Sequence, residues 1–211
     1  KVLDPVEALK IMRQTTLGLQ YAEELGLVHR DIKPANVLIR QDGVVKVADL
    51  GLAILAGRED LRLTAPGSLV GTPSFMSPEA IDAVRDLDIR TDIYAMGCTF
   101  YMAVCGRAPF TGQVVQICQG QKYGTPTRPC ELRADLLPAF ERLLLICLEK
   151  DRNARYQNTT TLLEGIDFVM DVYAGKRGAG EMPPPAGSTG PSGASPDGLQ
   201  ADDIFGFGLA T

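Results

Sequence analysis

The sequence lacks the features that mark secreted, zinc-binding and nucleic-acid-binding proteins. Its five cysteines are odd in number and never occur in CxxC spacing, which argues against a disulfide framework or a zinc site and favours a reducing cytoplasm. It has no basic run and a net charge of −5, so its charge does not favour binding to nucleic acid or to an anionic membrane. No uninterrupted apolar run is long enough to span a bilayer.

Length and one change in composition divide the chain into two parts. The 211 residues, 45% of them hydrophobic, suffice for one globular domain with a tail. Residues 174–198 contain twelve glycines and prolines among 25 residues and cannot bury enough apolar surface to offset the entropy of ordering. We therefore expect a domain over residues 1–173 and a disordered Gly/Pro/Ser-rich linker or tail over residues 174–211. The apolar residues 204–209 fit the edge of a membrane span, the edge of a further domain, or a simple tail.

Within the first part, periodicity and turn residues predict an α+β fold that is mostly helical with one small β-hairpin. Asp4 as N-cap and Pro5 at the first helical position begin an amphipathic helix that ends near Gly26. A long apolar run predicts a buried central helix that Asp92 starts. The hairpin strands are expected at 37–39 and 44–47, the central helix at 91–105, further helices at 78–84, 111–120, 135–149 and 159–172, and a long loop at 51–76.

One short stretch places together the groups that phosphoryl transfer requires. Residues 29–36 read HRDIKPAN, with a carboxylate, an ammonium group and an amide on one predicted loop. Thirteen residues after that stretch, just past the second predicted strand, the chain reads Asp49-Leu50-Gly51. Two carboxylates and an amide, brought together by a hairpin, can hold a divalent metal and accept the proton of an alcohol. The tripeptide SPE follows at residues 77–79.

These motifs and their spacing resemble serine/threonine protein kinases, most closely the bacterial, eukaryotic-like branch, from about Asp4 to Asp171. The resemblance implies the C-terminal lobe of a kinase that transfers the γ-phosphate of ATP to serine or threonine hydroxyls of protein substrates in signalling. In such a kinase Asp31 would accept the hydroxyl proton, and Lys33 would neutralise charge on the γ-phosphate. The family's metal ligands correspond here to Asn36 and Asp49, which would hold Mg²⁺ or Mn²⁺.

The resemblance also implies roles for residues that surround the nucleotide and the substrate. On the substrate side, the hydroxyl of Thr72 would bond to the catalytic aspartate and lysine. Ala35 and Leu38 would line the nucleotide site, with Leu38 as the floor beneath the adenine. Family members that select arginine three residues before the acceptor read it with two carboxylates, and the matching positions here are Ala35 and Met102. We therefore expect no such requirement, unless acids such as Asp135 or Glu131 replace those carboxylates.

A further set of residues is expected to hold the loop of residues 29–36, the predicted catalytic loop, in shape. His29, the only histidine, is interpreted as a core residue that packs beneath Leu50 and not as a general base. Asp92 would cap the backbone amides of the catalytic loop. Glu79 and Arg155 would form a buried ion pair that ties the end of the long loop to the last helices.

Regulation by phosphorylation receives mixed support from the sequence. Arg30 is the type of residue that binds a phosphorylated activation loop, for which Thr64 and Ser68 are the candidate phosphosites. The family often adds a second basic residue where this chain has Ile54, so the phosphate pocket would be thinner. Both hydroxyl residues also fit an ordinary loop.

What the family pattern has and this sequence lacks is everything that covers the nucleotide from above. The sequence contains no glycine-rich loop, no V-A-I-K lysine and no helix glutamate to pair with it, and it begins with Lys1. We expect a C-terminal lobe from a longer protein, inactive alone, whose kinase domain is cytoplasmic and tethered to a membrane only if a span follows. Two alternatives remain: a pseudokinase that serves as a binding scaffold, and a small-molecule phosphotransferase. The SPE tripeptide and the Glu79–Arg155 pair favour a protein kinase over the latter.

Overall fold

The computed structural model describes residues 2–49, 72–178 and 180. Within these residues the chain is mainly helical, with a single two-stranded antiparallel sheet. The predicted α+β fold is confirmed. Most of the predicted long loop, nearly all of the predicted linker and the apolar residues 204–209 lie outside the described residues.

Helix α1, Pro5–Glu24, begins where the sequence predicts it. The Asp4 carboxylate accepts a hydrogen bond from the amide of Val6 at 3.0 Å, and Pro5 occupies a position where its missing N–H costs nothing. Beyond the helix, Gly26 adopts φ 70°, the left-handed conformation that glycine tolerates without strain. The helix prediction is therefore confirmed at both ends.

The predicted hairpin follows α1 and the catalytic loop. Strands β1, Val37–Ile39, and β2, Val45–Val47, pair antiparallel with Val37 opposite Val47. A single 3₁₀ turn, η1, Pro34–Asn36, leads into β1. The hairpin is confirmed, although its second strand begins one residue later than predicted. The catalytic loop before β1 and residue 49 after β2 therefore lie together at the open end of the hairpin, away from its turn.

The central helix α4, Ile89–Cys105, starts earlier than the sequence suggested. Its N-cap is Asp88, whose carboxylate accepts from the backbone of the first turn, so the prediction that Asp92 starts the helix is wrong. Asp92 lies in the first turn with its side chain free to face another segment. A Cβ atom on Gly97 would lie 2.7 Å from the Cβ of Cys147, so glycine allows α4 to approach α7 closely.

The remaining helices follow the predicted order with shifted ends. Pro138 at the first position starts α7 three residues later than expected, because proline fits the beginning of a helix and not its interior. The one-turn helix α6 was not predicted, since four residues are too few to show a helical period. These elements are η2, Pro73–Phe75; α3, Pro78–Ile81; α5, Val114–Tyr123; α6, Pro129–Leu132; α7, Pro138–Cys147; η3, Arg152–Ala154; and α8, Thr159–Tyr173.

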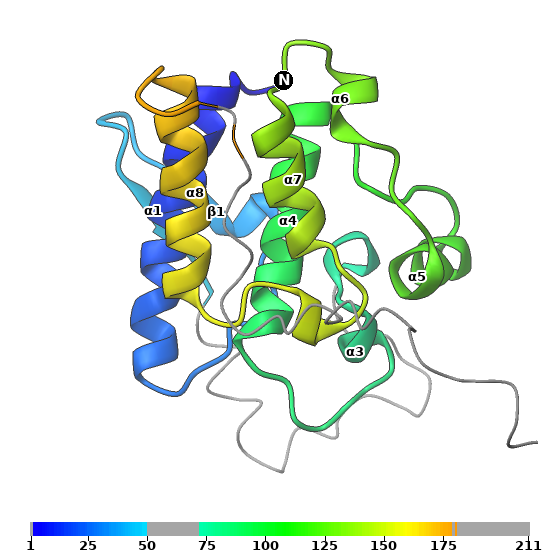
Figure 1. The fold of residues 1–211 in the computed structure, drawn as a ribbon. Helices are drawn as coiled ribbons and strands as arrows, with labels where there is room; N and C mark the ends of the chain where they lie inside the picture. Colours follow the sequence, from blue (N-terminus) through cyan, green and yellow to red (C-terminus); the bar gives the residue numbers. More distant parts are fainter. Residues whose placement is uncertain (1, 50–71, 179, 181–211) are drawn as a thin grey trace, which may run out of the picture.

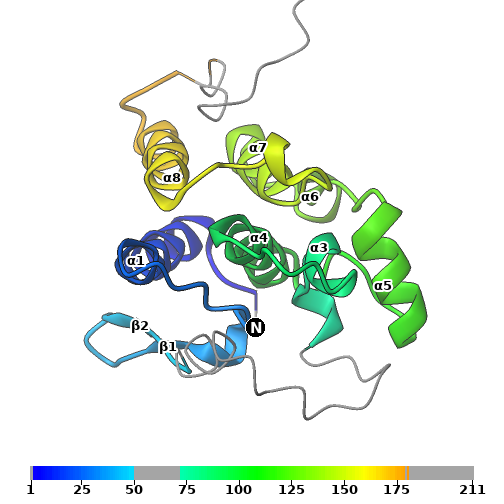
Figure 2. The same ribbon diagram turned by 90° about the horizontal axis from the view of Figure 1, so that it is seen from below.

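The helices form two layers, with the hairpin on the outside of the first. Viewed along the helices, α1 and α4 form the middle layer, α7 and α8 lie on one side of it and the hairpin on the other (Figure 2). Helices α3 and α5 extend the fold beyond α4 (Figure 1). Buried apolar side chains of α1, α4, α7 and α8 form one core. None of the described helices combines the length and apolar character needed to cross a membrane.

Candidate active site

The loop between α1 and η1 gathers an acid, a base and an amide within hydrogen-bond distance. Lys33 Nζ lies 2.7 Å from Asp31 Oδ2. Asn36 Nδ2 donates to the backbone oxygen of Asp31 at 2.8 Å and to Asp31 Oδ2 at 3.1 Å. Asp31 Oδ1 accepts no hydrogen bond from the described residues, so one carboxylate oxygen is held and the other can receive a substrate proton.

The same contacts orient Asn36 for metal binding. Because its Nδ2 is committed to Asp31, its Oδ1 is the atom left to bind a cation. Asp49 at the end of the hairpin is exposed and supplies a second hard oxygen donor. Among the described residues no three acidic, histidine or cysteine side chains are grouped to hold a metal alone. Two protein oxygens with phosphate and water in the remaining positions are the coordination that Mg²⁺ favours, so these residues fit a Mg²⁺–nucleotide.

Two site residues have a backbone conformation that non-glycine residues rarely adopt. Arg30 has φ 67° and Asp49 has φ 62°. Such conformations persist only where surrounding contacts enforce them, and they gather at functional sites. The residue before Asp49 is held on both sides: His29 Nε2 donates to the oxygen of Ala48 at 2.8 Å, and the amide of Ala48 donates to the oxygen of Asn36 at 2.8 Å. The hairpin end and the catalytic loop are thereby locked together.

A fully buried carboxylate anchors the loop to α4. Asp92, with 0% exposure, accepts from the amide of His29 at 2.7 Å and from that of Arg30 at 2.8 Å. Burial raises the pKa of Asp92 to about 6, while these two amide hydrogen bonds act in the opposite direction. His29 is also fully buried, and its Nδ1 accepts from the amide of Asp31 at 3.3 Å. Both ring nitrogens are thus engaged with the backbone, a geometry that supports a structural and not a proton-transferring histidine.

A buried ion pair joins the segment after residue 72 to the end of the domain. Arg155 is fully buried and its Nη1 and Nη2 lie 2.7 and 2.9 Å from the two oxygens of Glu79. Thr91 Oγ1 donates to Glu79 at 3.0 Å. Burial by itself would raise the pKa of Glu79, but the hydrogen bonds and charge of Arg155 outweigh it and hold that pKa below its usual range. The structure therefore contains the ion pair that the motif suggested.

Comparison with known proteins identifies the family. The protein kinase domain family matches residues 1–164. The chain belongs to this family. A serine/threonine-protein kinase PksC from Streptomyces coelicolor is 36% identical over 74% of this chain and 28% of its own length. A probable serine/threonine-protein kinase PknB from Corynebacterium glutamicum is 34% identical over 76% of this chain and 26% of its own length. Another S. coelicolor protein, a probable serine/threonine-protein kinase, is 32% identical over 79% of this chain and 25% of its own length. The chain spans about a quarter of the length of these curated relatives.

Within this kinase domain, one expected substrate-side contact is not formed. Thr72 is exposed, and its hydroxyl makes no hydrogen bond to Asp31 or Lys33 in the described structure. Lys33 and Asp31 Oδ2 instead contact each other at 2.7 Å, while Asp31 Oδ1 stays open. Thr72 instead precedes η2, and its backbone oxygen accepts from the amide of Phe75 at 3.0 Å.

The residues expected on the nucleotide side of the kinase are open to solvent. Leu38 is 52% exposed and Ala35 is exposed beside the site. Arg30, the expected phosphate ligand, is exposed as well. Four further expected residues lie outside the described residues and receive no structural account: Leu50, Gly51, Thr64 and Ser68.

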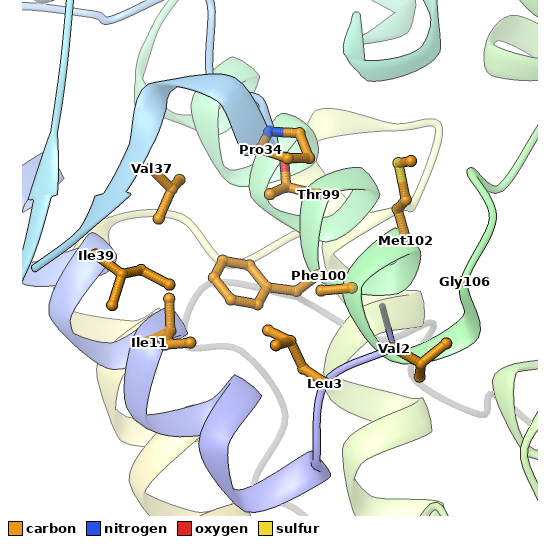
Figure 3. A pocket seen from close by; sticks show the side chains of 11 residues that line it. Val2, Leu3, Ile11, Pro34, Val37, Ile39, Thr99, Phe100, Met102 and Gly106 are labelled. Atoms are coloured by element: carbon orange, nitrogen blue, oxygen red, sulfur yellow. The ribbon is translucent and has the colours of Figure 1, made fainter. Parts of the chain in front are cut away.

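A cavity of about 410 Å³ lies beneath the hairpin of the kinase domain, between the start of α1 and the second half of α4. Figure 3 shows Val37 and Ile39 of β1 pointing into it, together with Phe100. Side chains alternate across a strand, so Leu38 projects from the opposite face of β1. The cavity is therefore separate from the face on which the adenine is expected. Met102, one of the two positions expected to bear on peptide selectivity, and Pro34 line it too.

Two residues that hold the site in place were missed by sequence reasoning. Thr91 supports Glu79, and the buried Gln121 of α5 donates to the backbone oxygens of Pro73 and Ser74. Gln121 lies 47 and 48 residues from these partners along the chain, and nothing in its local sequence distinguishes it from exposed glutamines such as Gln119. Only the packing of α5 against η2 reveals it.

Proposed function

We propose that this chain carries the phosphoryl-transfer site of a serine/threonine protein kinase that uses ATP with Mg²⁺ or Mn²⁺. The observation that carries the proposal is the cluster of Asp31, Lys33 and Asn36, in which one carboxylate oxygen is held and the other is left open. A bound metal nucleotide would supply the transferable phosphoryl group and neutralise its charge. Its protein ligands would be Asn36 and Asp49.

The proposed chemistry follows from the positions of two side chains. Asp31 would orient a serine or threonine hydroxyl through its open oxygen and accept its proton as the hydroxyl oxygen bonds to the γ-phosphorus. The bond from that phosphorus to the oxygen bridging the β- and γ-phosphates would break, and ADP would leave. Lys33 holds the other oxygen at 2.7 Å and places its positive charge where negative charge develops on the transferred group. Orientation accounts for more of the rate than basicity, because the transition state is loose.

Two features favour protein substrates over small molecules and catalysis over a scaffold role. The buried Glu79–Arg155 pair anchors the segment that follows η2, beside which a peptide would lie, and the relatives are named serine/threonine-protein kinases. The polar groups that this part of a kinase would supply to the transfer, Asp31, Lys33, Asn36 and Asp49, are all in the sequence, which disfavours a pseudokinase. The net charge of −5 gives no basis for a nucleic-acid partner.

We further propose that the domain ends with α8, which stops at Tyr173, and that residues 174–211 act as a linker or tail. The kinase domain would act in the cytoplasm, with a membrane tether only if a span follows the tail. Arg30 would bind a phosphate on Thr64 or Ser68 if either becomes phosphorylated.

Labelled ATP tests the proposal. The protein expressed from its complete gene is incubated with [γ-³²P]ATP, Mg²⁺ and a generic protein substrate, and the labelled amino acids are identified after acid hydrolysis. Phosphoserine or phosphothreonine is the expected product. Label that appears only on a small-molecule acceptor would support the phosphotransferase alternative, and Mg²⁺-dependent nucleotide binding without any transfer would support the pseudokinase.

Peptide selectivity is expected to lack a requirement for arginine three residues before the acceptor. Neither Ala35 nor Met102 offers an oxygen, so an incoming guanidinium would lose hydration without gaining a charged partner. Asp135, which could have replaced them, is paired with Arg133 through both carboxylate oxygens at 2.9 and 3.1 Å. Met102, 38% exposed, would favour an uncharged or apolar residue instead. Phosphorylation of an oriented peptide library measures the preference, and strong selection for arginine there would contradict the prediction.

The 211-residue chain by itself is expected to bind Mg²⁺–ATP weakly. Leu38, the expected adenine floor, is 52% exposed, and no glycine-rich loop in the sequence is available to cover the nucleotide. A small ligand reaches micromolar affinity when most of its surface is buried. Isothermal titration calorimetry should therefore give a dissociation constant above about 100 µM. A low-micromolar value would show that these residues close over the nucleotide unaided.

A further inference from the structure

We infer that Gln121 is a positioning residue for the peptide substrate: it fixes the backbone at residues 73–75, and with it the surface beside Thr72. The inference rests on the proposed kinase function and names a residue through which substrate affinity is set. Gln121 touches neither the nucleotide site nor Asp31, so its effect is expected on the peptide and not on ATP.

The side chain of Gln121 makes its contacts in full burial, with 0% exposure. Its Nε2 donates to the oxygen of Ser74 at 2.8 Å and to that of Pro73 at 3.2 Å. Element η2 is a single 3₁₀ turn in which the oxygen of Pro73 also accepts from the amide of Met76 at 3.3 Å, whereas no backbone amide of the described residues donates to the oxygen of Ser74. The side-chain amide of Gln121 therefore supplies the donor that the turn lacks at Ser74 and a second donor at Pro73.

The opposite end of the Gln121 amide is held just as firmly. Its Oε1 accepts from the hydroxyl of Tyr94 at 2.6 Å. Lys150 Nζ then donates to that hydroxyl at 3.2 Å and to the backbone oxygen of Gln121 at 2.8 Å. Lys150 donates to the Tyr94 hydroxyl, which in turn donates to Oε1, and backbone oxygens accept from Nε2 on the other side, so only one orientation of the amide satisfies all partners.

The helix that carries Gln121 has little freedom to move. A Cβ atom on Gly120 would lie 2.6 Å from the ring of Phe110, so α5 packs directly on that ring. Lys150 Nζ lies 4.4 Å from the centre of the same ring. Lys122 pairs with Asp82 at 2.5 Å and ties α5 to the end of α3. A rigid α5 transmits its position to η2 through Gln121.

These contacts place a fixed donor behind the segment that a peptide would meet. Thr72, directly before η2, is exposed, and Glu79 after it is anchored by Arg155. The segment between them is thus held at two points, by Gln121 near its beginning and by the ion pair near its end. Loss of the first should let residues 73–75 sample other conformations, which weakens peptide binding while the Asp31–Asn36 loop stays in place.

The test compares two identical chemical changes on the same helix. Q121E keeps the side-chain size and the acceptor for Tyr94 but turns the donor that faces two backbone oxygens into a carboxylate oxygen. Q119E makes the same change at an exposed position. In the protein expressed from its complete gene, Q121E is expected to raise the KM for peptide about tenfold and to leave the KM for ATP within about twofold of wild type, whereas Q119E changes neither.

A second variant separates positioning from general loss of stability. Y94F removes the hydroxyl that Gln121 accepts from but leaves both bonds from Gln121 to η2. It is expected to lower the melting temperature with a smaller rise in peptide KM than Q121E. Should Q121E not fold, Q121M, which has similar length and no donor, takes its place.

The possible outcomes are distinct. A peptide KM unchanged in Q121E, or peptide and ATP KM values that rise together in proportion to lost stability, overturns the inference and leaves the kinase function standing. A wild-type protein that phosphorylates no peptide overturns both.

Discussion

D31N is expected to abolish phosphoryl transfer while nucleotide binding remains. The substitution keeps the size of the side chain and removes the only carboxylate in the cluster with Lys33 and Asn36. An amide cannot accept the proton of the substrate hydroxyl, and a correctly placed general base contributes about 10²–10⁴-fold to the rate. We expect kcat to fall by at least that range, with the KM for ATP little changed, because Asn36 and Asp49 remain.

The matched control is D42N. Asp42 lies in the turn of the hairpin and is 49% exposed at its side chain; within the described residues it forms an ion pair with the exposed Arg40 and accepts from the amide of Val44 at 3.2 Å. The same loss of charge there should leave the kinetics unaltered. Autophosphorylation is measured with labelled ATP, and melting temperatures establish that both variants fold. Turnover of D31N close to that of D42N would remove Asp31 from the mechanism.

R155A is expected to be the most damaging single truncation for stability. All five N–H groups of Arg155 are used: two reach the Glu79 oxygens and three reach the backbone oxygens of Arg90, Glu149 and Lys150 at 3.0, 2.7 and 3.1 Å. The guanidinium carbon also lies 4.8 Å from the centre of the Tyr94 ring. Removing one partner of a buried pair costs about 3–5 kcal/mol, because the other charge stays buried without compensation.

The control for R155A is R13A, the same truncation at the surface. Arg13 pairs with Asp167 at 2.7 Å, but the two side chains are 40% and 48% exposed. Such a pair contributes about 0–1 kcal/mol. Urea unfolding of the 211-residue chain, followed by circular dichroism, gives both free energies. If R155A costs so much stability that the chain is unfolded without urea while R13A stays folded, the prediction is also met. Equal losses of unfolding free energy in the two variants would mean that Glu79 is solvated.

The pH dependence adds an independent check on the same pair. The pKa of Glu79 in the folded protein lies below its usual range, so the stability that the pair contributes is present above the unfolded-state pKa and is lost as pH falls through the folded pKa. Without Arg155, burial alone would raise the pKa of Glu79, and protonation would relieve the uncompensated charge. The difference in unfolding free energy between wild type and R155A should therefore shrink as pH is lowered from about 7 to about 4.

The local parts of this protein follow from residues that are close together in the chain. Asp4 and Pro5 specify the start of α1 because a cap bonds to amides two and three residues away. The hairpin follows from two short β-branched runs and a turn, and the acid, base and amide of the catalytic loop lie within six residues of each other. In each case the partners are neighbours in the chain, so their geometry depends little on the rest of the fold.

Contacts between residues far apart in the chain depend on the tertiary fold. Asp92 and the His29 amide are 63 residues apart, and Glu79 and Arg155 are 76 apart; family resemblance suggested both contacts, but no local rule could. Nothing in the local sequence indicated the role of Gln121. Helices α4 and α7 start at other residues than predicted, because Asp88 and Pro138 are better helix starts than the positions that periodicity indicated. The physical reason is that a buried polar side chain takes its role from the donors and acceptors that packing places around it, and those are settled only when the helices pack together.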